Sequence, residues 1–335
     1  MYVLELGGED DDFAAREARS AATDVRVVAP GVATAATVAA DRLRGLAYTH
    51  RASRLVARTD AAPESARAAL EAASLDRTGS VAVRARDVKR STGVDTQAVE
   101  RTLGAVLVDR GFSVDLEDPD HELRALFSRP DADDETTDDA ADGVCLLGWL
   151  DAESERDFGE RKPTDKPFFQ PGSMDPLLAR ALVNVAGAGP GTTLLDPMCG
   201  TGGVLVEAGL VGARVVGADA QQKMARGAAR NLDHFLPDGE FATLRGDATH
   251  LPLRDDSVDA VVFDAPYGRQ SKIAHLDLDD LVAGALVEAR RVADRAVVVG
   301  DRRWAPTARD VGWSVESEFE RRVHRSLTRH VVVLE

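Results

Sequence analysis

The sequence has few cysteines, few lysines and few aromatic residues, and it has no long apolar run. Its two cysteines, Cys145 and Cys199, match no metal-ligand spacing and no disulfide framework, so we expect no metal site and a reducing cytoplasm. No stretch of about 18 apolar residues is present. Met1 is followed by Tyr-Val-Leu-Glu rather than by a basic and then an apolar run. We therefore expect neither a membrane span nor a signal peptide.

Positive charge is also scarce. The 335 residues hold 41 Lys and Arg against 57 Asp and Glu, a net charge of −16. Such a charge argues against a nucleic-acid partner, because phosphates bind cations. The same acid excess with only five lysines is typical of halophile proteins, whose charges are strongly screened by salt. An RNA partner therefore stays possible where basic residues cluster locally.

The first part of the chain, up to about residue 150, predicts a small α+β domain. Strands are expected at 1–6, 25–34, 80–90 and 143–150, a strand, a turn and a second strand at 112–131, and helices at 11–21 and 95–111. Asp95 is a candidate N-cap and Gly111 a candidate C-terminal stop of the second helix. This order favours an antiparallel sheet with helices on one face. Residues 130–143 hold seven acids and predict a solvated loop with no chemical role.

A proline-rich segment, residues 151–176, predicts an extended connector between domains. Beyond it, helices at 177–189, 202–212, 221–235 and 280–293 alternate with apolar strands at 192–196, 213–219, 241–247, 258–264 and 295–301, before a final strand pair. This alternation predicts an α/β domain with a mostly parallel, doubly wound sheet. The expected domains are 1–50, 51–152 and 173–335, with a linker at 153–172.

Four of the expected apolar strands end in an acid, namely Asp196, Asp219, Asp247 and Asp264. Ligands of such sheets bind at the carboxyl ends of the strands. Gly200 and Gly202 follow Asp196, but the dinucleotide fingerprint G-x-G-x-x-G is not met. An acid before the glycines suits a cation rather than a pyrophosphate, and S-adenosylmethionine carries two cationic groups and no phosphate.

The other acids fit the same cofactor. Asp219, 23 residues after Asp196, suits a carboxylate that bridges ribose hydroxyls, and Asp247 with Ala248 suits the adenine. Taken one at a time, each acid could instead be a helix cap and each glycine a tight turn. The recurrence of the pattern at successive strands favours the cofactor site.

The stretch Asp264-Ala265-Pro266-Tyr267 predicts the reacting end of the site. An exocyclic purine amine is a poor nucleophile, and the Asp264 carboxylate with the Ala265 carbonyl could hold its hydrogens and align its lone pair with a methyl donor. Pro266 would stiffen the loop, and Tyr267 could stack on a base flipped out of its helix. A simple turn after a strand is the alternative.

Several segments resemble the archaeal tRNA guanine-N2 methyltransferases that methylate guanosine 10. They are LLDPMCGTGGVLVEAG, GADAQQKMARGAARNL, DAPYGRQS, KPFFQPGSMDPLLARALVNVAG and VHRSLTRHVVVLE. The resemblance covers most of the chain and weakens before residue 75. It implies a Rossmann-like class I methyltransferase domain after a ferredoxin-like and THUMP module that grips tRNA, and products that are N2-methyl- and N2,N2-dimethylguanosine.

The resemblance also implies residue roles. It places Asp196, Gly200 and Gly202 around the methionine moiety, Asp219 on the ribose, Asp247 on the adenine and residues 264–267 at the target amine. Where the family has Asp-Pro-Pro-Tyr, this chain has Ala265 at the first proline, which implies some lost rigidity and slower chemistry. A monomer, or a pair with a small activator subunit, is expected.

Basic residues that could contact RNA phosphates lie in three places: Arg84, Arg86, Lys89 and Arg90; Arg161, Lys162 and Lys166 in the linker; and Arg322, His324 and Arg325 near the end. An ordinary charged surface is the alternative for each group.

Three rival functions remain open. The target could be guanine 6 of tRNA or a ribosomal guanine, the protein could be a non-catalytic RNA-binding protein, or the substrate could be a protein glutamine. The basic first half disfavours the last, and a DNA amino-methyltransferase would need its own base-reading domain.

Overall fold

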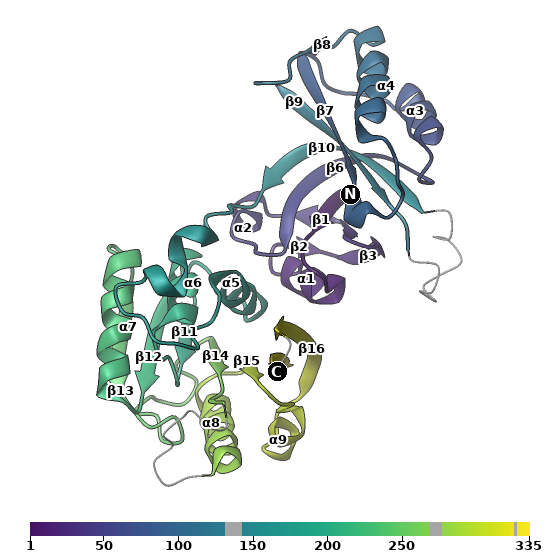
Figure 1. Ribbon diagram of the computed structural model, residues 1–335. Coiled ribbons are helices and arrows are strands. Elements are labelled where there is room, and N and C mark those ends of the chain that lie inside the picture. Colours follow the sequence, from purple (N-terminus) through teal and green to yellow (C-terminus); the bar gives the residue numbers. More distant parts are fainter. Residues whose placement is uncertain (131–142, 268–276, 325–326) are drawn as a thin grey trace. The chain divides into compact units, whose positions relative to one another are not determined.

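The computed structural model describes residues 1–130, 143–267, 277–324 and 327–335. They form two compact units, Met1–Glu155 and Arg156–Glu335, which are taken separately below (Figure 1). The acidic residues 131–142, most of the expected loop, lie outside the described parts. No helix in the parts that the structure describes is long and apolar enough to cross a membrane.

The first unit is built on an eight-stranded sheet in the order β3-β4-β1-β6-β10-β9-β7-β8. Its elements are β1 (Tyr2–Leu6), α1 (Asp11–Ala18), β2 (Ala22–Thr23), β3 (Arg26–Ala29), β4 (Val32–Ala35), β5 (Thr37–Val38), α2 (Ala40–Leu43), β6 (Thr49–Thr59), α3 (Pro63–Ala72), β7 (Ser80–Asp87), the 3-10 turn η1 (Val88–Arg90), α4 (Thr96–Asp109), β8 (Ser113–Val114), β9 (His121–Ser128) and β10 (Val144–Glu153).

The expected antiparallel sheet is only partly correct. Strand β7 pairs in parallel with both β8 and β9, because α4 carries the chain back across the sheet, as a parallel connection requires. The helix itself is confirmed: the Asp95 side chain accepts a hydrogen bond from Ala98 N (3.1 Å), and Gly111 follows with φ +93°. The central strand β6 and helix α3 were not predicted.

The core of this unit lies on both faces of the sheet. Along β9, Phe127 packs into a cluster with Leu103 of α4 and Trp149 of β10, whereas its neighbour Leu126 packs into a second cluster with Val3. Adjacent residues of a strand point to opposite faces, so one strand serves both clusters. The unit therefore folds around its own two-sided core.

The second unit contains a seven-stranded sheet in the order β13-β12-β11-β14-β15-β17-β16. Its elements are η3 (Phe158–Arg161), η4 (Pro163–Asp165), α5 (Pro176–Val185), β11 (Thr193–Asp196), α6 (Gly203–Leu210), β12 (Arg214–Asp219), α7 (Gln222–Phe235), β13 (Phe241–Arg245), β14 (Ala260–Asp264), α8 (Leu278–Val292), β15 (Ala296–Gly300), α9 (Ala305–Asp310), β16 (Val315–His324) and β17 (Leu327–Leu334).

This sheet confirms the expected doubly wound α/β fold. The five neighbouring strands β13, β12, β11, β14 and β15 are parallel. Strand β17 pairs antiparallel with both β15 and β16. Figure 1 shows α5, α6 and α7 on one side of the sheet and α8 and α9 on the other. Since helices cover both faces, the strand interiors are apolar and chemistry is confined to the strand ends.

Candidate active site

Three carboxylates lie at the carboxyl ends of three adjacent strands. Asp219 ends β12, Asp196 ends β11 and Asp264 ends β14, in this order across the sheet. The fourth acid, Asp247, does not end a strand: it follows β13 by two residues, is exposed, and accepts hydrogen bonds from Thr249 N (2.9 Å) and Oγ1 (2.8 Å). The pattern that suggested the cofactor site thus produces a row of three acids with a fourth beside it.

Asp196 is the most deeply buried of these acids, at 3% exposure. Met198 N donates to its Oδ1 (3.0 Å), and no ion pair to it is found among the described residues. Burial, and then the charges of Asp219 and Asp264 on either side, raise the pKa of Asp196 well above its ordinary value. A cation bound here would reverse that cost, so the site favours a positively charged ligand.

The loop that follows Asp196 comes close to the second strand end. Gly200 (φ +50°) donates its N–H to Asp219 Oδ2 (3.1 Å), and Gly202 (φ +76°) directly precedes α6. A Cβ on Gly202 would lie 3.1 Å from that of Ala228, whereas one on Gly200 would meet no atom within 4 Å. The loop therefore needs Gly202 for packing and leaves open space at Gly200, where a ligand can approach the backbone.

Asp219 is held ready for a ligand. Its Oδ1 accepts from Gln221 N (2.8 Å), and its other oxygen accepts from Gly200 N. A carboxylate has about four acceptor sites, so two remain for a pair of hydroxyl groups. Burial raises the pKa of this carboxyl as well. Ala248, expected beside the adenine, is buried at 5% exposure.

Asp264 belongs to a three-residue network. Tyr267 donates its hydroxyl to Asp264 Oδ1 (2.6 Å), Arg329 Nε donates to the same hydroxyl (2.9 Å), and Arg329 Nη2 lies 3.5 Å from Asp264 Oδ2. Burial raises the pKa of Asp264 to about 6, although Arg329 and Tyr267 oppose the rise. The carboxylate is thus ionised near neutral pH yet basic enough to accept a proton.

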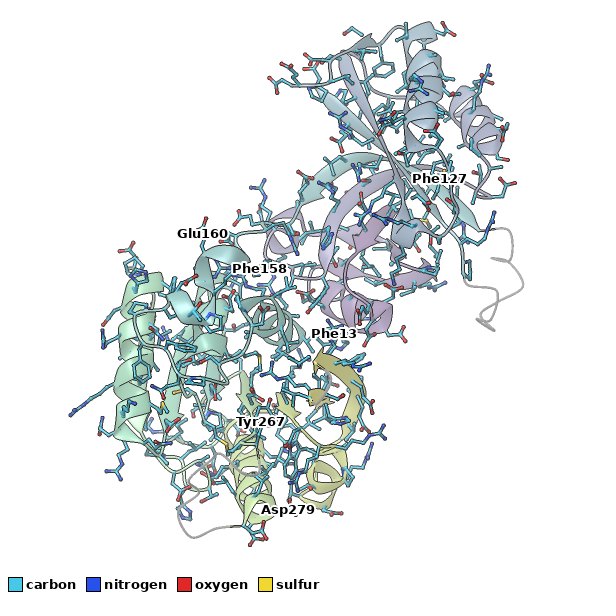
Figure 2. All side chains as sticks on the ribbon, in the orientation of Figure 1. Phe13, Phe127, Phe158, Glu160, Tyr267 and Asp279 are labelled. Carbon is cyan, nitrogen blue, oxygen red and sulfur yellow. The ribbon has the colours of Figure 1, made fainter. Side chains whose placement is uncertain are left out.

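Arg329 is the residue that sequence reasoning missed. It lies in β17, is 5% exposed, and its guanidinium carbon is 5.9 Å from the centre of the Tyr267 ring (Tyr267 is labelled in Figure 2). The available signal was a basic residue in a strand that is otherwise apolar at its end, Val331 to Leu334. Its partners are 62 and 65 residues away, so only the strand order reveals it.

The substitution of Ala265 for proline has a structural compensation. Ala265 N donates to the carbonyl of Val299 in β15 (2.7 Å), a bond that proline cannot make because it has no N–H. Ala265 is 1% exposed, and Pro266 follows it. The loop is therefore anchored to the sheet by a hydrogen bond where the resembling family has a second ring.

The expected extended linker is instead packed onto the second unit. Residues 158–165 form two 3-10 turns, and the guanidinium carbon of Arg180 in α5 lies 5.5 Å from the centre of the Phe158 ring (Phe158 is labelled in Figure 2). Arg161 (4% exposed) binds Glu207 of α6, Nε to Oε1, at 2.8 Å. Lys166 is 6% exposed. The prediction that Arg161 and Lys166 contact RNA is wrong, because neither reaches the surface.

The other basic candidates lie on surfaces, some of them already paired. Arg86 binds the buried Glu5 (3.1 Å), Lys89 binds Asp11 (2.8 Å), and Arg84 donates to the carbonyl of Leu116 (2.7 Å). Lys89 and Arg90 lie in η1 rather than on the expected strand. Both are exposed, as are Lys162 and Arg322. Arg325 and the side chain of His324 lie outside the described residues, and the roles of all these groups in RNA binding stay predictions.

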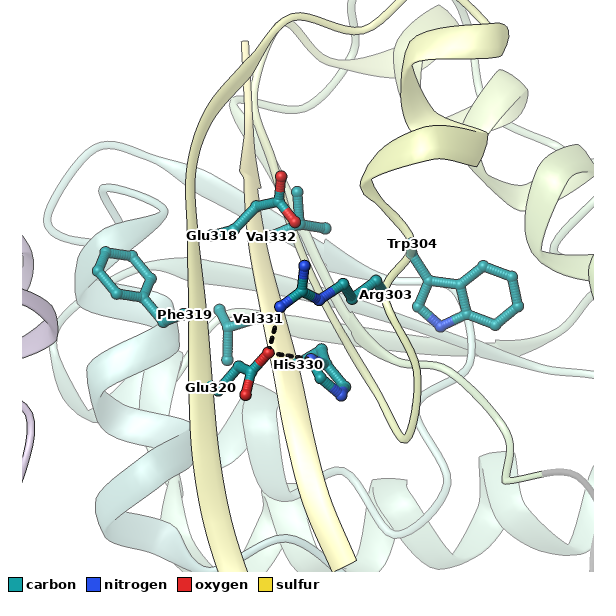
Figure 3. A pocket seen from close by; sticks show the side chains of 8 residues that line it. All are labelled: Arg303, Trp304, Glu318, Phe319, Glu320, His330, Val331 and Val332. Carbon is teal, nitrogen blue, oxygen red and sulfur yellow. Dashed lines mark hydrogen bonds and ion pairs between the residues drawn. The ribbon is translucent and has the colours of Figure 1, made fainter.

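Apart from the strand-end site, a hollow lies between the start of α9 and the strands β16 and β17 (Figure 3). Its charges have partners: Glu320 accepts from Arg303 (2.6 Å) and lies 3.5 Å from His330 Nδ1, and Glu318 pairs with Arg309 (3.1 Å), which lies outside the hollow. Trp304 borders it with its ring buried. Among the residues that the structure describes, this hollow offers no unmatched charge to a ligand. Within the described ranges, no group of three or more His, Cys, Asp or Glu could hold a metal ion.

The row of acids fits S-adenosylmethionine. Asp196 suits an ammonium, Asp219 a ribose diol, and the open backbone at Gly200 a close approach of the ligand. Asp264 lies on the neighbouring strand, where a methyl acceptor would meet the cofactor. A phosphate-bearing cofactor does not fit, since three carboxylates would repel it.

Comparison with known proteins agrees with this geometry. Residues 163–330 match the family model described as UPF0020: RMKL-like, methyltransferase domain. The tRNA (guanine(10)-N2)-dimethyltransferase of Methanothermobacter thermautotrophicus is 38% identical over 76% of this chain and 73% of its own length. The enzyme of the same name from Pyrococcus abyssi is 29% identical over 77% of this chain and 74% of its own length.

Among solved structures, TrmN from Thermus thermophilus has a TM-score of 0.50 at 24% identity, covering 100% of this chain and 99% of that chain. This likeness shows the fold alone. The sequence matches, the strand order and the row of acids together place the chain among S-adenosylmethionine-dependent methyltransferases. The chain belongs to the RMKL-like methyltransferase family and is a relative, within it, of the archaeal tRNA (guanine(10)-N2)-dimethyltransferases.

Proposed function

We propose that this protein transfers methyl groups from S-adenosylmethionine to the exocyclic N2 amine of guanosine 10 in tRNA, giving N2-methyl- and N2,N2-dimethylguanosine. One observation carries the proposal. The second unit places Asp264, held by Tyr267 and Arg329, next to Asp196 in a chain whose relative at 38% identity is named for that reaction.

The residues at the end of β14 supply the chemistry at the amine. The cofactor contributes a methyl group on a positively charged sulfur. Asp264 and the Ala265 carbonyl accept the amine hydrogens and turn the nitrogen lone pair toward that methyl. As the N–C bond forms and the S–C bond breaks, positive charge develops on nitrogen, and Asp264 stabilises it and takes the proton.

Tyr267 and Arg329 fix the position of that carboxylate. The Tyr267 hydroxyl donates a hydrogen bond to Asp264 Oδ1. Arg329 Nε donates to that hydroxyl, and Arg329 Nη2 lies near Asp264 Oδ2. In the described part of the chain no other donor is recorded for Asp264, so its remaining lone pairs can receive the amine. The Tyr267 ring would then lie against the flipped base, with Arg329 behind it. Proximity and alignment supply most of the acceleration in such a site.

The first unit is proposed to grip the tRNA. It would contain a ferredoxin-like region (1–50) and a THUMP-like module (51–152), with Arg84, Arg86, Lys89 and Arg90 near the phosphates and Arg322 and Arg325 assisting from the second unit. The composition supports a halophilic source, and we propose a cytoplasmic enzyme that acts as a monomer or with a small activator subunit.

The test is methyl transfer from labelled S-adenosylmethionine to unmodified tRNA transcripts in high potassium chloride. Transcripts with guanosine 10 intact or replaced are compared, and the nucleosides are identified by digestion and mass spectrometry. N2-methylated guanosine only in the intact transcript is the expected result. Equal label in both would move the target to another guanine, such as position 6. Label in neither, with cofactor bound, would favour a non-catalytic RNA-binding protein or a protein substrate.

A further inference from the structure

Lys166 carries a buried ammonium group with no hydrogen-bond partner among the described residues. The residue is 6% exposed, and its Nζ is shielded from solvent. Burial lowers its pKa. A buried ammonium needs a partner to offset its desolvation, so this group calls for an explanation.

Neighbouring carboxylates do not supply that partner. Glu207, fully buried, is bound by Arg161 (2.8 Å) and Arg180 (2.8 Å), and no ion pair joins it to Lys166 in the described parts of the chain. Asp175 uses its side chain to cap α5, accepting from Leu177 N (2.9 Å). Arg161 also binds Asp157 (2.6 Å), so two carboxylates pair with the two arginines. Glu207 and Asp175 attract the Lys166 ammonium only at longer range, and in the described parts of the chain it is the cation of this cluster without an ion pair.

The Lys166 ammonium lies at the beginning of α6. A Cβ built on Gly203, the first residue of that helix, would lie 3.2 Å from Nζ. Gly202 precedes the helix in a left-handed conformation and offers no side chain to its first turn. The N–H groups of a first turn lack partners within the helix, and the helix dipole favours negative charge there. An ammonium and an open helix N-terminus together form an anion site.

Within the described ranges, the loop 196–203 thus has an acid without an ion pair at one end and an ammonium without an ion pair at the other. Asp196 begins the loop and is buried without a cation, whereas Lys166 meets its end at Gly203. An α-amino acid group carries an ammonium and a carboxylate on one carbon, so it can satisfy both ends at once.

We propose that Lys166, with the first turn of α6, binds the α-carboxylate of the methionine moiety of S-adenosylmethionine while Asp196 binds its ammonium. This inference rests on the proposed function in that it takes the same cofactor, and it assigns a residue that sequence reasoning placed on RNA. It makes the free carboxylate a condition for tight binding.

The experiment is a cycle of two ligands and two proteins, measured by calorimetry without RNA. The ligands are S-adenosylhomocysteine and its decarboxylated analogue, S-adenosyl-3-thiopropylamine, which lacks only the carboxylate. The proteins are the wild type and Lys166→Met, with Lys162→Met as the matched control, an exposed lysine four residues away. The wild type should bind S-adenosylhomocysteine about ten- to a hundredfold more tightly than the analogue, as a charge-assisted contact implies.

Lys166→Met should remove that preference by lowering the affinity for S-adenosylhomocysteine but not for the analogue. Lys162→Met should keep the preference. The ligand-free Lys166→Met protein should also melt at a higher temperature, since a desolvated charge has been replaced by an apolar chain of similar length. Should the variant fail to fold, equal affinity of the wild type for the two ligands would still overturn the inference.

Equal affinity of the wild type for both ligands would overturn the inference, and so would an equal loss for both in the variant, which would indicate a structural lysine. These outcomes leave the proposed function intact. Failure of the wild type to bind either ligand would instead remove the cofactor and both proposals together.

Discussion

Asp264 is subject to two opposed demands. Its position at the end of β14 buries it, which favours the protonated form, and its proposed role requires the ionised form. Arg329 and Tyr267 lower the pKa that burial raises, and the balance lies at about 6. Catalysis and stability should therefore respond to pH in opposite directions through this one residue.

We expect kcat/KM, which reports the pKa values of the free enzyme, to fall as the pH drops below about 6, because Asp264 becomes protonated and no longer accepts the amine hydrogens. The folded state binds this proton more tightly than the unfolded state, whose pKa is near 3.8, so the stability that the residue contributes is present at low pH and is lost as the pH rises from about 3.8 to about 6. The difference in unfolding free energy between wild type and Asp264→Asn should change by up to about 3 kcal/mol across that window.

The measurements are pH profiles of kcat/KM and of denaturant unfolding. Asp264→Asn should remove turnover and leave the affinity for S-adenosylhomocysteine nearly unchanged. Equal loss of both properties would show that Asp264 holds the cofactor rather than the amine.

Arg329→Gln should move the acid limb of the kcat/KM profile upward by about one pH unit or more. The change removes the cation that lowers the pKa of Asp264 and the donor to the Tyr267 hydroxyl. Arg329→Lys, which keeps the charge, should move it less, and Arg309→Gln, which breaks a surface ion pair with Glu318, should not move it. A lower kcat with an unmoved limb would mean that Arg329 acts on folding alone.

At this scale the sequence indicated Asp196, Asp219 and Asp264 because each ends an apolar strand, a local signal. Arg329 carried no such signal. Its role depends on β17 lying beside β15, which brings it past the end of that strand toward Tyr267. The prediction that Lys166 and Arg161 contact RNA was wrong for the same reason. The sequence of a proline-rich segment does not indicate which surface of the protein it packs against.

At the scale of elements, the loop between β11 and α6 is the part that the cofactor must meet. A comparison of substitutions at Gly191 and Gly200 can separate the effect of this loop on ligand binding from the effect of backbone strain on stability. Both have positive φ, +83° and +50°, and a Cβ on either would meet no atom within 4 Å. They differ in position: Gly200 donates a hydrogen bond to Asp219 in the candidate site, whereas Gly191 lies before β11.

Gly191→Ala and Gly200→Ala should each cost about 1–2 kcal/mol of stability, since an L-residue is strained in the left-handed region. Only Gly200→Ala should also lower the affinity for S-adenosylhomocysteine, by about tenfold or more, because the alanine methyl group enters the space that the ligand needs. Thermal unfolding and calorimetry on the same samples test both statements. A similar affinity in the two variants would move the ligand away from Gly200.

The elements of the second unit were largely predictable, because continuous apolar strands between amphipathic helices give a strong periodic signal. The short helix α9 gave none. In the first unit, strand β6 was missed because its arginines interrupt the apolar pattern, and Glu153 of β10 and Glu5 of β1 pair with Arg51 on it. Parallel pairing of β7 with β9 is a long-range property that strand patterns alone do not specify.

At the scale of the whole molecule, the net charge of −16 opposes folding through self-repulsion. Many arginines are matched locally, as Arg161 and Arg291 are by Glu207 and Glu288, but the acid excess as a whole is not. Salt shortens the Debye length from about 10 Å at 0.1 M to about 3 Å at 1 M, so the repulsion should weaken over that range.

We therefore expect the melting temperature to rise by several degrees between about 0.1 and 1 M potassium chloride, with most of the rise at the lower end because screening saturates there. Specific salt effects can be separated by comparing potassium chloride with potassium sulfate at equal ionic strength. Screening predicts matching curves at low ionic strength, and preferential exclusion of sulfate predicts divergence above it. A melting temperature that is flat in both salts would contradict the charge argument and, with it, the proposal of a halophilic source.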